Sequence, residues 1–339
     1  MSLCVYPLMK ISKRFLLTGH VDHGKSSLGG QLLYQCGALD EREVQKIFEQ
    51  AEQEKMYSFR WARLLDINTE ERERGVTIES NEIEFDYHND KYKLIDTPGH
   101  KLYIRHLIEA IYRNTADGNV IGVLVLSALP SELEAAMSSG QVKEDILLLR
   151  AVGVDSIVVA INKLDKYEWL TEQPCRAREA FDKTKNTIFP MLKSARYKQI
   201  AFAACSGLEG KGIIDRSFTD IPPLMDSIID LSATVTSNKG ALKSLELSTI
   251  SAEIFILNCN IFSPGYIGMI HMNQGEYSFT VDEVKKLSTT KKTKSMPFIK
   301  TGDRGRVMLT LSDKIMVNDK DRIVLRNSDR TIAYGVVTL

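Results

Sequence analysis

The sequence predicts an α/β domain with a mostly parallel, doubly wound sheet, followed by a small all-β barrel. Strands alternate with helices in the first two-thirds, and several of those strands are continuous apolar runs. After about residue 247 the segments become short and β-rich, with no convincing helix between them. Apolar strands of this kind are buried on both faces and belong to parallel sheets that helices cover. A length of 339 residues suits two such domains.

The composition is that of an ordinary soluble globular protein, with 43% hydrophobic and 26% charged residues. A net charge of zero argues against a generally basic nucleic-acid binder, so any RNA contact must be local, and DNA is not an expected partner. The five cysteines are scattered without a CxxC pair, which fits a reducing, cytoplasmic compartment. No apolar run approaches the roughly 20 residues that span a bilayer, and we expect no membrane partner and no signal peptide.

Six strands are expected in the first domain. They are Arg14–Gly19, Glu82–Tyr87, Lys91–Asp96, Val120–Ser127, Ser156–Asn162 and Ile200–Cys205. The second and third form an antiparallel hairpin, because Asn89-Asp90 between them is a turn dipeptide. The runs VIGVLVL and SIVVAIN lack polar alternation, which indicates burial on both faces.

Helical patterns lie between these strands. In YIRHLIEAIYR the apolar residues recur at i, i+3, i+4, i+7 and i+8, which places them on one face. Further helices are expected at 27–36, at Lys143–Val152 before Gly153, and at DIPPLMDSIIDL. The segment LPSELEAAMSSGQ is expected to be a loop.

The last third is expected to form a barrel of about six strands. The candidate segments are ISAEIFIL, YIGMIHM, YSFTVDEVKKL, GRVMLTL, DRIVLRN and TIAYGVVTL. We predict domains at 1–232 and 248–339, joined by a linker at 233–247 whose small, polar composition favours an irregular connection. The basic run Lys285–Lys294 is interpreted as a solvated loop, or alternatively as a contact for ribosomal RNA or an acidic partner.

The segment GHVDHGKS, residues 19–26, matches the phosphate-loop pattern GxxxxGK[ST]. It follows a strand and opens a helix, so its backbone N–H groups and the helix N-terminus can surround phosphate oxygens. Lys25 can reach the β- and γ-phosphates, and the Ser26 hydroxyl can bind Mg²⁺. The residues of this loop that we expect to bind nucleotide are Asp22, His23, Gly24, Lys25, Ser26 and Ser27.

Two polar segments follow other strands of the same sheet. In DTPGH, Asp96 can hold Mg²⁺ directly or through water, and the N–H of Gly99 can meet a γ-phosphate. In NKLD, Asp165 can accept two hydrogen bonds from N1 and N2 of guanine, which adenine does not offer. The pattern therefore predicts a guanine nucleotide.

The remaining base contacts are expected from three neighbouring segments. Asn162 can contact the edge of the ring, and the stem of Lys163 can cover its face. Cys205-Ser206-Gly207 follows the last strand and is expected to close over the base through backbone N–H groups.

The motifs GHVDHGKSS, RWARLLDINTEERERGVTIES, DTPGH and NKLD resemble those of the translational GTPases. The resemblance is to the Tu-like group of elongation factor 1A and the release-and-rescue GTPases, and it covers nearly all of residues 12–210. The predicted barrel resembles the third domain of that family. The resemblance implies a P-loop GTPase domain that uses GTP, GDP and Mg²⁺ and that hydrolyses GTP slowly without an activating partner.

Several residue roles are implied by the resemblance alone. Thr77 would bind Mg²⁺ in the GTP state, and His100 would position the attacking water. Val21 and Val76 would form an apolar gate that restrains His100. The alternatives are that both valines pack on the core and that His100 is a surface residue. The other histidines are interpreted as ordinary side chains without a metal role; they are His20, His23, His88, His106 and His271.

The resembled family has two barrels after the GTPase domain, and this sequence has room for one. A missing barrel amounts to about 100 residues. Ordinary tRNA delivery is therefore not expected, whereas the ribosome and a release-factor-like or rescue-factor-like protein on the barrel are candidate partners. Asp145 in GQVKED also departs from the family, which has a histidine there. Loss of a domain beside retained motifs is a change that we expect of a divergent or virus-encoded copy.

Three hypotheses follow for the function. The first is a GTP-hydrolysing switch that acts on translation with altered partners. The second is a nucleotide-loaded mimic that occupies a ribosomal or factor site without turnover. The third is a GTPase of another pathway. The presence of Lys25, Thr77 and His100 favours the first over the second.

Overall fold

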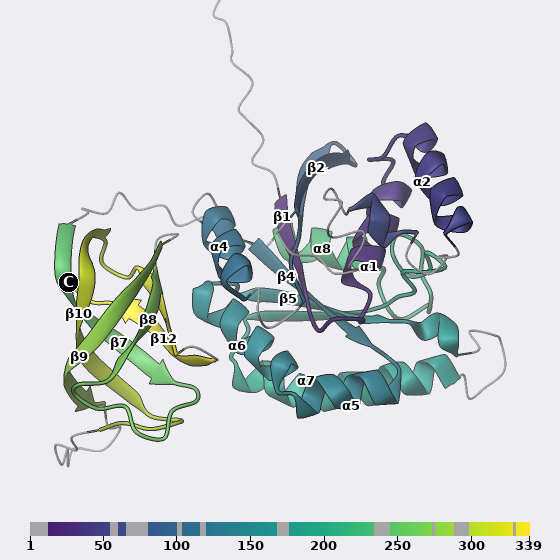
Figure 1. The fold of residues 1–339 in the computed structure, drawn as a ribbon. Coiled ribbons are helices and arrows are strands. Elements are labelled where there is room, and N and C mark those ends of the chain that lie inside the picture. The colour runs from purple at the N-terminus through teal and green to yellow at the C-terminus, as the bar shows by residue number, and fades with distance from the viewer. Residues whose placement is uncertain are drawn as a thin grey trace, which may run out of the picture. The chain divides into compact units, whose positions relative to one another are not determined.

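The structure is a computed structural model of the chain. It describes residues 13–54, 60–65, 81–99, 104–115, 120–167, 176–233, 245–272, 275–287, 298–327 and 330–339. The chain divides into two compact units, one built around a six-stranded sheet and the other around a closed barrel (Figure 1). This confirms the predicted fold class.

The sheet of the first unit has the strand order β2-β3-β1-β4-β5-β6. Its strands are β1 (Lys13–Thr18), β2 (Asn81–Tyr87), β3 (Asp90–Asp96), β4 (Val120–Ser127), β5 (Ser156–Asn162) and β6 (Gln199–Ala204). All neighbouring pairs are parallel except β2 with β3. The carboxyl ends of the five parallel strands therefore lie at one edge of the sheet, where ligands bind in folds of this type.

The hairpin between β2 and β3 turns one residue earlier than the sequence predicts. The turn is formed by His88 and Asn89, whose φ angles are 46° and 64°. Asp90 is paired with Tyr87 and is already part of β3. Two consecutive residues with positive φ make the turn whose twist matches that of the strands, and the dipeptide Asn89-Asp90 does not provide it.

Seven α-helices and two short 3₁₀ helices are described in the chain before the barrel strands. The α-helices are α1 (Lys25–Gln35), α2 (Glu41–Gln53), α4 (Ile104–Thr115), α5 (Pro130–Ser138), α6 (Gln141–Val152), α7 (Arg176–Ser194) and α8 (Leu224–Ala233). The 3₁₀ helices are η2 (Ala62–Leu64) and η4 (Leu164–Lys166). Among the described helices, none combines the length and the apolar character that crossing a bilayer requires.

The expectation of a loop at LPSELEAAMSSGQ is wrong, because α5 lies there. Pro130 is its first residue, and Glu132 lies in its first turn. Proline at the first position and an acidic residue near the N-terminus both favour the start of a helix. Helix α2 is not among the helices expected from the sequence. It begins after Asp40, whose carboxylate accepts hydrogen bonds from the N–H groups of Arg42 and Glu43.

The core of the sheet unit confirms the expectation from the apolar runs. Every residue of β4 and of β5 is buried. One apolar cluster joins the inner face of α1, through Leu28 and Leu32, with Val125 of the sheet and with Met225 of α8. In Figure 1, α1 and α8 lie on one side of the sheet, and α5, α6 and α7 on the other.

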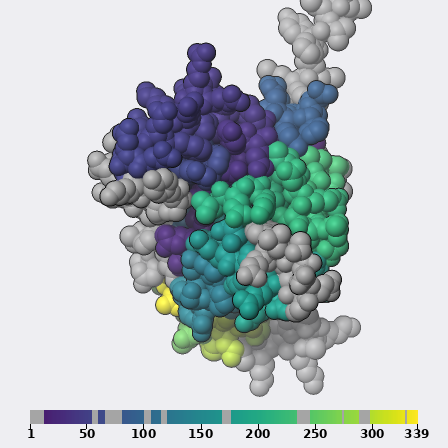
Figure 2. Space-filling view, turned by 90° about the vertical axis from the view of Figure 1, so that its right-hand side faces the viewer, coloured from purple at the N-terminus to yellow at the C-terminus, as the bar shows by residue number. Residues whose placement is uncertain are grey.

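The segment that follows β6 is held by the N-terminal elements of the same unit. The side chain of Gln35 donates from Nε2 to the carbonyl of Gly210 at 2.7 Å, and Trp61 donates from Nε1 to the carbonyl of Leu208 at 3.1 Å. Figure 2 shows the N-terminal residues, in purple and blue, beside the green segment to which these carbonyls belong. The segment just after Cys205-Ser206-Gly207, which is predicted to close over a base, is therefore anchored by N-terminal side chains.

The second unit is a closed barrel of six antiparallel strands in the order β10-β7-β12-β11-β8-β9. The strands are β7 (Leu245–Ile256), β8 (Ile267–Met272), β9 (Gly275–Lys286), β10 (Arg304–Val317), β11 (Arg322–Arg326) and β12 (Thr331–Val337). Buried and exposed residues alternate along β10, as expected of a barrel wall. All six predicted strands are present. The predicted linker falls largely outside the described residues and remains a prediction, as does the role of the basic run.

Replacement of Leu309 by alanine should destabilise the barrel by about 2–5 kcal/mol, because this side chain is 0% exposed and its loss leaves a cavity. Its neighbour Met308 is 38% exposed on the outer face of the same strand, so Met308→Ala should change the stability by less than about 0.5 kcal/mol. Amide hydrogen exchange of the barrel strands, measured in increasing urea, gives both values. Equal losses in the two variants would contradict the assigned inner and outer faces.

Candidate functional site

The predicted phosphate loop lies between β1 and α1 and has the tight backbone that its function requires. Gly19, Asp22 and Gly24 have φ angles of 139°, 66° and 81°. A side chain at Gly19 would collide with the carbonyl of Val125, so only glycine allows the loop to approach β4 this closely. The loop is therefore pressed against the neighbouring strand.

The N-terminus of α1 faces this loop without a side-chain cap from the described residues. Its first helical hydrogen bond runs from the N–H of Leu28 to the carbonyl of Gly24 at 2.9 Å. The N–H groups of the first turn, from Lys25 to Ser27, precede that bond and lie outside the ladder of helical hydrogen bonds. Such groups, with the helix dipole, form an anion-binding site.

The side chain of Lys25 is folded into the loop. It is 6% exposed, and its Nζ donates to the carbonyl of His20 at 3.1 Å. Burial lowers the pKa of Lys25, while nearby carboxylates, that of Asp96 above all, favour its charged form. Asp145, the residue that departs from the resembled family, adds to this effect. A side chain at Gly99 would collide with Nζ, so Gly99 lies directly beside Lys25.

Two oxygen donors meet at the base of the loop. The Ser26 hydroxyl donates to Oδ2 of Asp96 at 2.9 Å, and Asp96 is fully buried at the end of β3. Thr97 donates from Oγ1 to the carbonyl of Leu17 at 2.6 Å, which fixes the chain after Asp96. Mg²⁺ prefers one or two such oxygens, with water and phosphate completing its shell. The described residues contain no group of three or more His, Cys, Asp and Glu side chains that could hold a metal.

The NKLD segment follows β5 and is tied to both neighbouring loops. Asn162 is 2% exposed and donates from Nδ2 to the carbonyl of His23 at 2.9 Å. Its Oδ1 accepts from the N–H of Gly207 at 2.8 Å. Asp165 accepts at Oδ1 from the Ser206 hydroxyl at 2.7 Å. The structure thus brings together the phosphate loop and the two segments that the sequence assigns to the base.

The backbone of Cys205-Ser206-Gly207 differs from the expectation. The three N–H groups donate within the protein, to the carbonyls of Ile161 and Lys211 and to the side chain of Asn162, at 2.8 to 2.9 Å. They support the loops, therefore, and are not directed at a ligand. The Cys205 thiol is fully buried, and this burial raises its pKa. The segment acts as a brace because the polar groups of a buried turn must find partners nearby.

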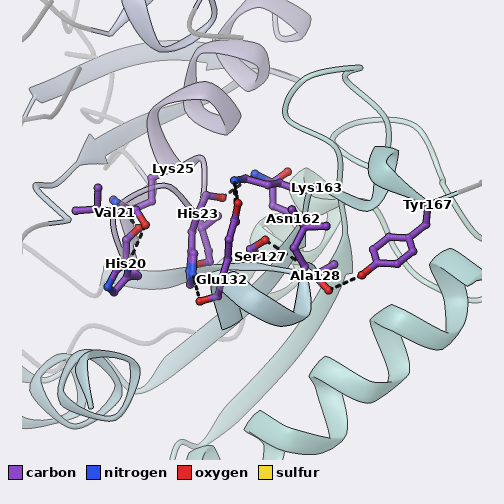
Figure 3. Close-up of polar contacts among 12 residues, drawn as sticks. His20, Val21, His23, Lys25, Ser127, Ala128, Glu132, Asn162, Lys163 and Tyr167 are labelled. Atoms are coloured by element: carbon purple, nitrogen blue, oxygen red, sulfur yellow. Dashed lines mark hydrogen bonds and ion pairs between the residues drawn. The ribbon is translucent and has the colours of Figure 1, made fainter. Parts of the chain in front are cut away.

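Lys163 has a partner that was not expected from the sequence. Nζ of Lys163 lies 2.8 and 2.7 Å from the two carboxylate oxygens of Glu132, which projects from the first turn of α5 (Figure 3). Burial alone would raise the pKa of Glu132, but hydrogen bonds from Lys163 and Ser127 hold it below its usual value. Pro130 and the acidic first turn are the sequence signals that could have placed this carboxylate on a helix.

The side chain of His23 faces the protein interior. It is 1% exposed, with Nδ1 at 3.2 Å from the carbonyl of Val125 and Nε2 at 3.5 Å from that of Glu132. Burial lowers the pKa of His23 to about 4, and the charge of Lys25 adds to this. His23 is therefore neutral at physiological pH and acts as a spacer between the loop and β4.

Part of the predicted catalytic set lies outside the described residues. Thr77, Val76 and His100 belong to this part, so their roles stay predictions. Val21 is described, half-buried near the tip of the phosphate loop, where its carbonyl lies 2.8 Å from Nδ1 of His20 (Figure 3).

Both parts of the chain match known domain families. The elongation factor Tu GTP binding domain family matches residues 10–234, and the elongation factor Tu C-terminal domain family matches residues 244–339. Elongation factor 1-alpha of Ignicoccus hospitalis is 38% identical over 205 residues, and that of Hyperthermus butylicus is 37% identical over 205 residues. In both cases the match covers 60% of this chain and 44% of the relative, so the matched region spans less than half of those proteins.

Solved structures share the fold. The Ski7 GTPase-like domain of S. cerevisiae, bound to GDP and inorganic phosphate, has a TM-score of 0.78 at 14% identity, over 96% of this chain and 97% of that chain. The bacterial selenocysteine-specific elongation factor EF-Sec has a TM-score of 0.60 at 15% identity, over 96% of this chain and 58% of that chain.

The burial of neutral His23 predicts a loss of stability in acid. Unfolded His23 takes up its proton near its ordinary pKa of 6.5, whereas native His23 does so only near 4. The unfolded state therefore binds more protons in this window, and stability should fall as the pH decreases from 6.5 to 4, by at most roughly 3 kcal/mol. Urea unfolding followed by tryptophan fluorescence between pH 4 and 7 measures this loss.

The variant His23→Asn cannot take up a proton and should show a correspondingly smaller loss over the same range. His88→Asn is the matched control, because His88 is exposed in a turn where asparagine adopts positive φ readily. If wild type and His23→Asn lose stability equally, the buried neutral state of His23 is contradicted.

Proposed function

The chain belongs to the translational GTPase family of the elongation factor Tu kind, and we propose that it is a GTP-binding and GTP-hydrolysing switch. We further propose that it acts on translation with altered partner specificity. The observation that carries the proposal is the convergence of three polar loops at the carboxyl ends of β1, β3 and β5. There Ser26 bonds to Asp96, and Asn162 bonds to His23 of the phosphate loop.

Different described residues would contact the phosphates, the Mg²⁺ ion and the base of the nucleotide. The N–H groups at the start of α1 and the ammonium of Lys25 would hold the phosphates. Ser26 and Asp96 would hold Mg²⁺, which when bound neutralises charge on the β- and γ-phosphate oxygens. Asp165 has a second carboxylate oxygen for the guanine base, since the Ser206 hydroxyl occupies Oδ1.

The hydrolytic step is proposed from the family resemblance. His100 would position the attacking water, and Val21 with Val76 would restrain His100 until a partner acts. Thr77 would add a ligand to Mg²⁺ in the GTP state and so couple its segment to the γ-phosphate. Intrinsic turnover would then be slow, on the order of 10⁻³ per second or below.

The partners are proposed from the way in which the two units follow one another. The two family matches leave residues 235–243 between them, which is far too few for another barrel of about 100 residues. We therefore propose that ordinary aminoacyl-tRNA delivery is not the role of this chain. The ribosome is the proposed activator, and a release-factor-like or rescue-factor-like protein is the proposed partner of the barrel.

Replacement of Asp165 by asparagine should change the base that is recognised. Asparagine cannot accept both hydrogen bonds from guanine, so the affinity for GDP should fall by about 100-fold or more. Xanthine carries a carbonyl where guanine has its amino group, so the variant should gain affinity for XDP. Asp86→Asn on the exposed face of β2 is the control. Calorimetric titration with GDP, XDP and ADP checks the result, and equal binding of ADP and GDP by wild type would refute the guanine assignment.

Ribosomes should accelerate GTP hydrolysis by orders of magnitude, because the proposed gate must be opened by a partner. His100→Ala should lose this acceleration while it still binds GTP. A single-turnover assay with and without ribosomes measures both effects. If wild type binds GTP but ribosomes never accelerate hydrolysis, the switch is refuted in favour of the nucleotide-loaded mimic. If His100→Ala keeps the accelerated rate, the role of His100 is refuted.

A further inference from the structure

The first turn of α5 contacts both halves of the proposed nucleotide site. The carboxylate of Glu132 accepts two hydrogen bonds from Nζ of Lys163, in the segment assigned to the base. The carbonyl of Glu132 lies 3.5 Å from Nε2 of His23, in the phosphate loop. Figure 3 shows Glu132 between these two residues.

The turn that presents Glu132 is held from two directions. The Ser127 hydroxyl accepts a hydrogen bond from the N–H of Leu129 at 3.1 Å, at the start of α5. From the base segment, the hydroxyl of Tyr167 donates to the carbonyl of Ala128 at 3.0 Å. The position of the Glu132 carboxylate is thus set by the end of β4 and by the segment that carries Lys163.

Lys163 itself is fixed at both ends. Its backbone has a φ of 64°, a conformation that residues other than glycine adopt rarely and that its neighbours must enforce. Asn162 beside it is buried and bonded to two loops. The backbone therefore determines where the lysine stem starts, and Glu132 determines where the ammonium ends.

We propose that Glu132 is a positioning residue for the guanine nucleotide. It anchors the ammonium of Lys163 so that the aliphatic stem is already extended where the base is to lie. A free lysine side chain has many rotamers, and ordering it only on binding would reduce affinity. Glu132 orders the Lys163 side chain before the nucleotide binds, so binding does not incur this entropic cost. The inference rests on the guanine site proposed above and extends it to a residue on α5.

A purely structural role for Glu132 would have different consequences. An acidic residue in the first turn stabilises a helix through its dipole, and that effect would change stability without changing nucleotide exchange. The ion pair is also partly exposed, with 23% of the Lys163 side chain and 30% of the Glu132 side chain accessible, so its contribution to stability is small. Nucleotide release therefore separates the two roles.

The effects of Lys163 and Glu132 on nucleotide affinity should also depend on each other. Removal of Lys163 alone leaves an uncompensated carboxylate beside the site of an anionic ligand, which disfavours that ligand. Removal of both side chains takes away the repulsion as well. The loss of affinity in the double variant should therefore be smaller than the sum of the two single losses.

The test is a double-mutant cycle on the full chain, with the dissociation rate of fluorescently labelled GDP as the readout. Glu132→Ala should accelerate release by roughly tenfold, and Glu132→Gln, which keeps a hydrogen-bond acceptor, by less. Lys163→Ala should accelerate release in wild type, and much less in the Glu132→Ala background. Glu134→Gln is the control, because Glu134 is exposed on the same helix.

Urea unfolding of each variant accompanies the rates, so that a loss of folding is recognised as such. Unchanged GDP release from both Glu132 variants would overturn the inference, and so would strictly additive effects of the two alanine substitutions. If wild type itself binds no guanine nucleotide, the proposed function fails. That result differs from the case in which wild type binds GDP and the Glu132 variants behave like it.

Discussion

The side-chain amide of Asn162 holds three loops of the sheet unit together. It donates to the phosphate loop at His23 and accepts from the segment after β6 at Gly207, while its own backbone ends β5. An amide that is 2% exposed must find partners inside the protein, because an unpaired buried polar group is costly. Both bonds form when the phosphate loop and the segment after β6 lie on either side of Asn162. The relative position of phosphate and base segments therefore follows from the demands of one buried group.

The same arrangement explains why the loops tolerate so little side-chain volume. Gly24 lies so close to the amide of Asn162 that an added Cβ would be 2.6 Å from Nδ2. Gly99 lies even closer to the ammonium of Lys25. Both glycines permit a backbone to approach a polar side chain, and a larger residue at either position would displace Asn162 or Lys25. The absence of a side chain at these glycines thus allows the close contacts that hold their neighbours in place.

The sequence predicts the parts of this site that depend on local patterns. Asp96 ends β3, and the segments that carry Ser26 and Asp165 follow β1 and β5. Parallel strands bring their carboxyl ends to one edge, so the convergence of these residues follows from order along the chain. The pairing of Lys163 with Glu132 does not, because it joins residues 31 positions apart, and α5 has no apolar stripe that announces a helix. The turn at His88-Asn89 was missed by one residue, since backbone twist and not the dipeptide alone sets the register.

The polar groups around the site fall into two classes, and the division indicates where a ligand belongs. The N–H groups of Cys205, Ser206 and Gly207 have protein partners and form a frame. The N–H groups at the start of α1 precede the first helical bond and have no side-chain cap among the described residues. A helix start of this kind is stable in water but gains more from an anion, because several donors and the helix dipole act on the same charge. In the proposed function, the backbone N–H groups of α1 and the ammonium of Lys25 would therefore hold the phosphates, whereas side chains that the frame positions would hold the base.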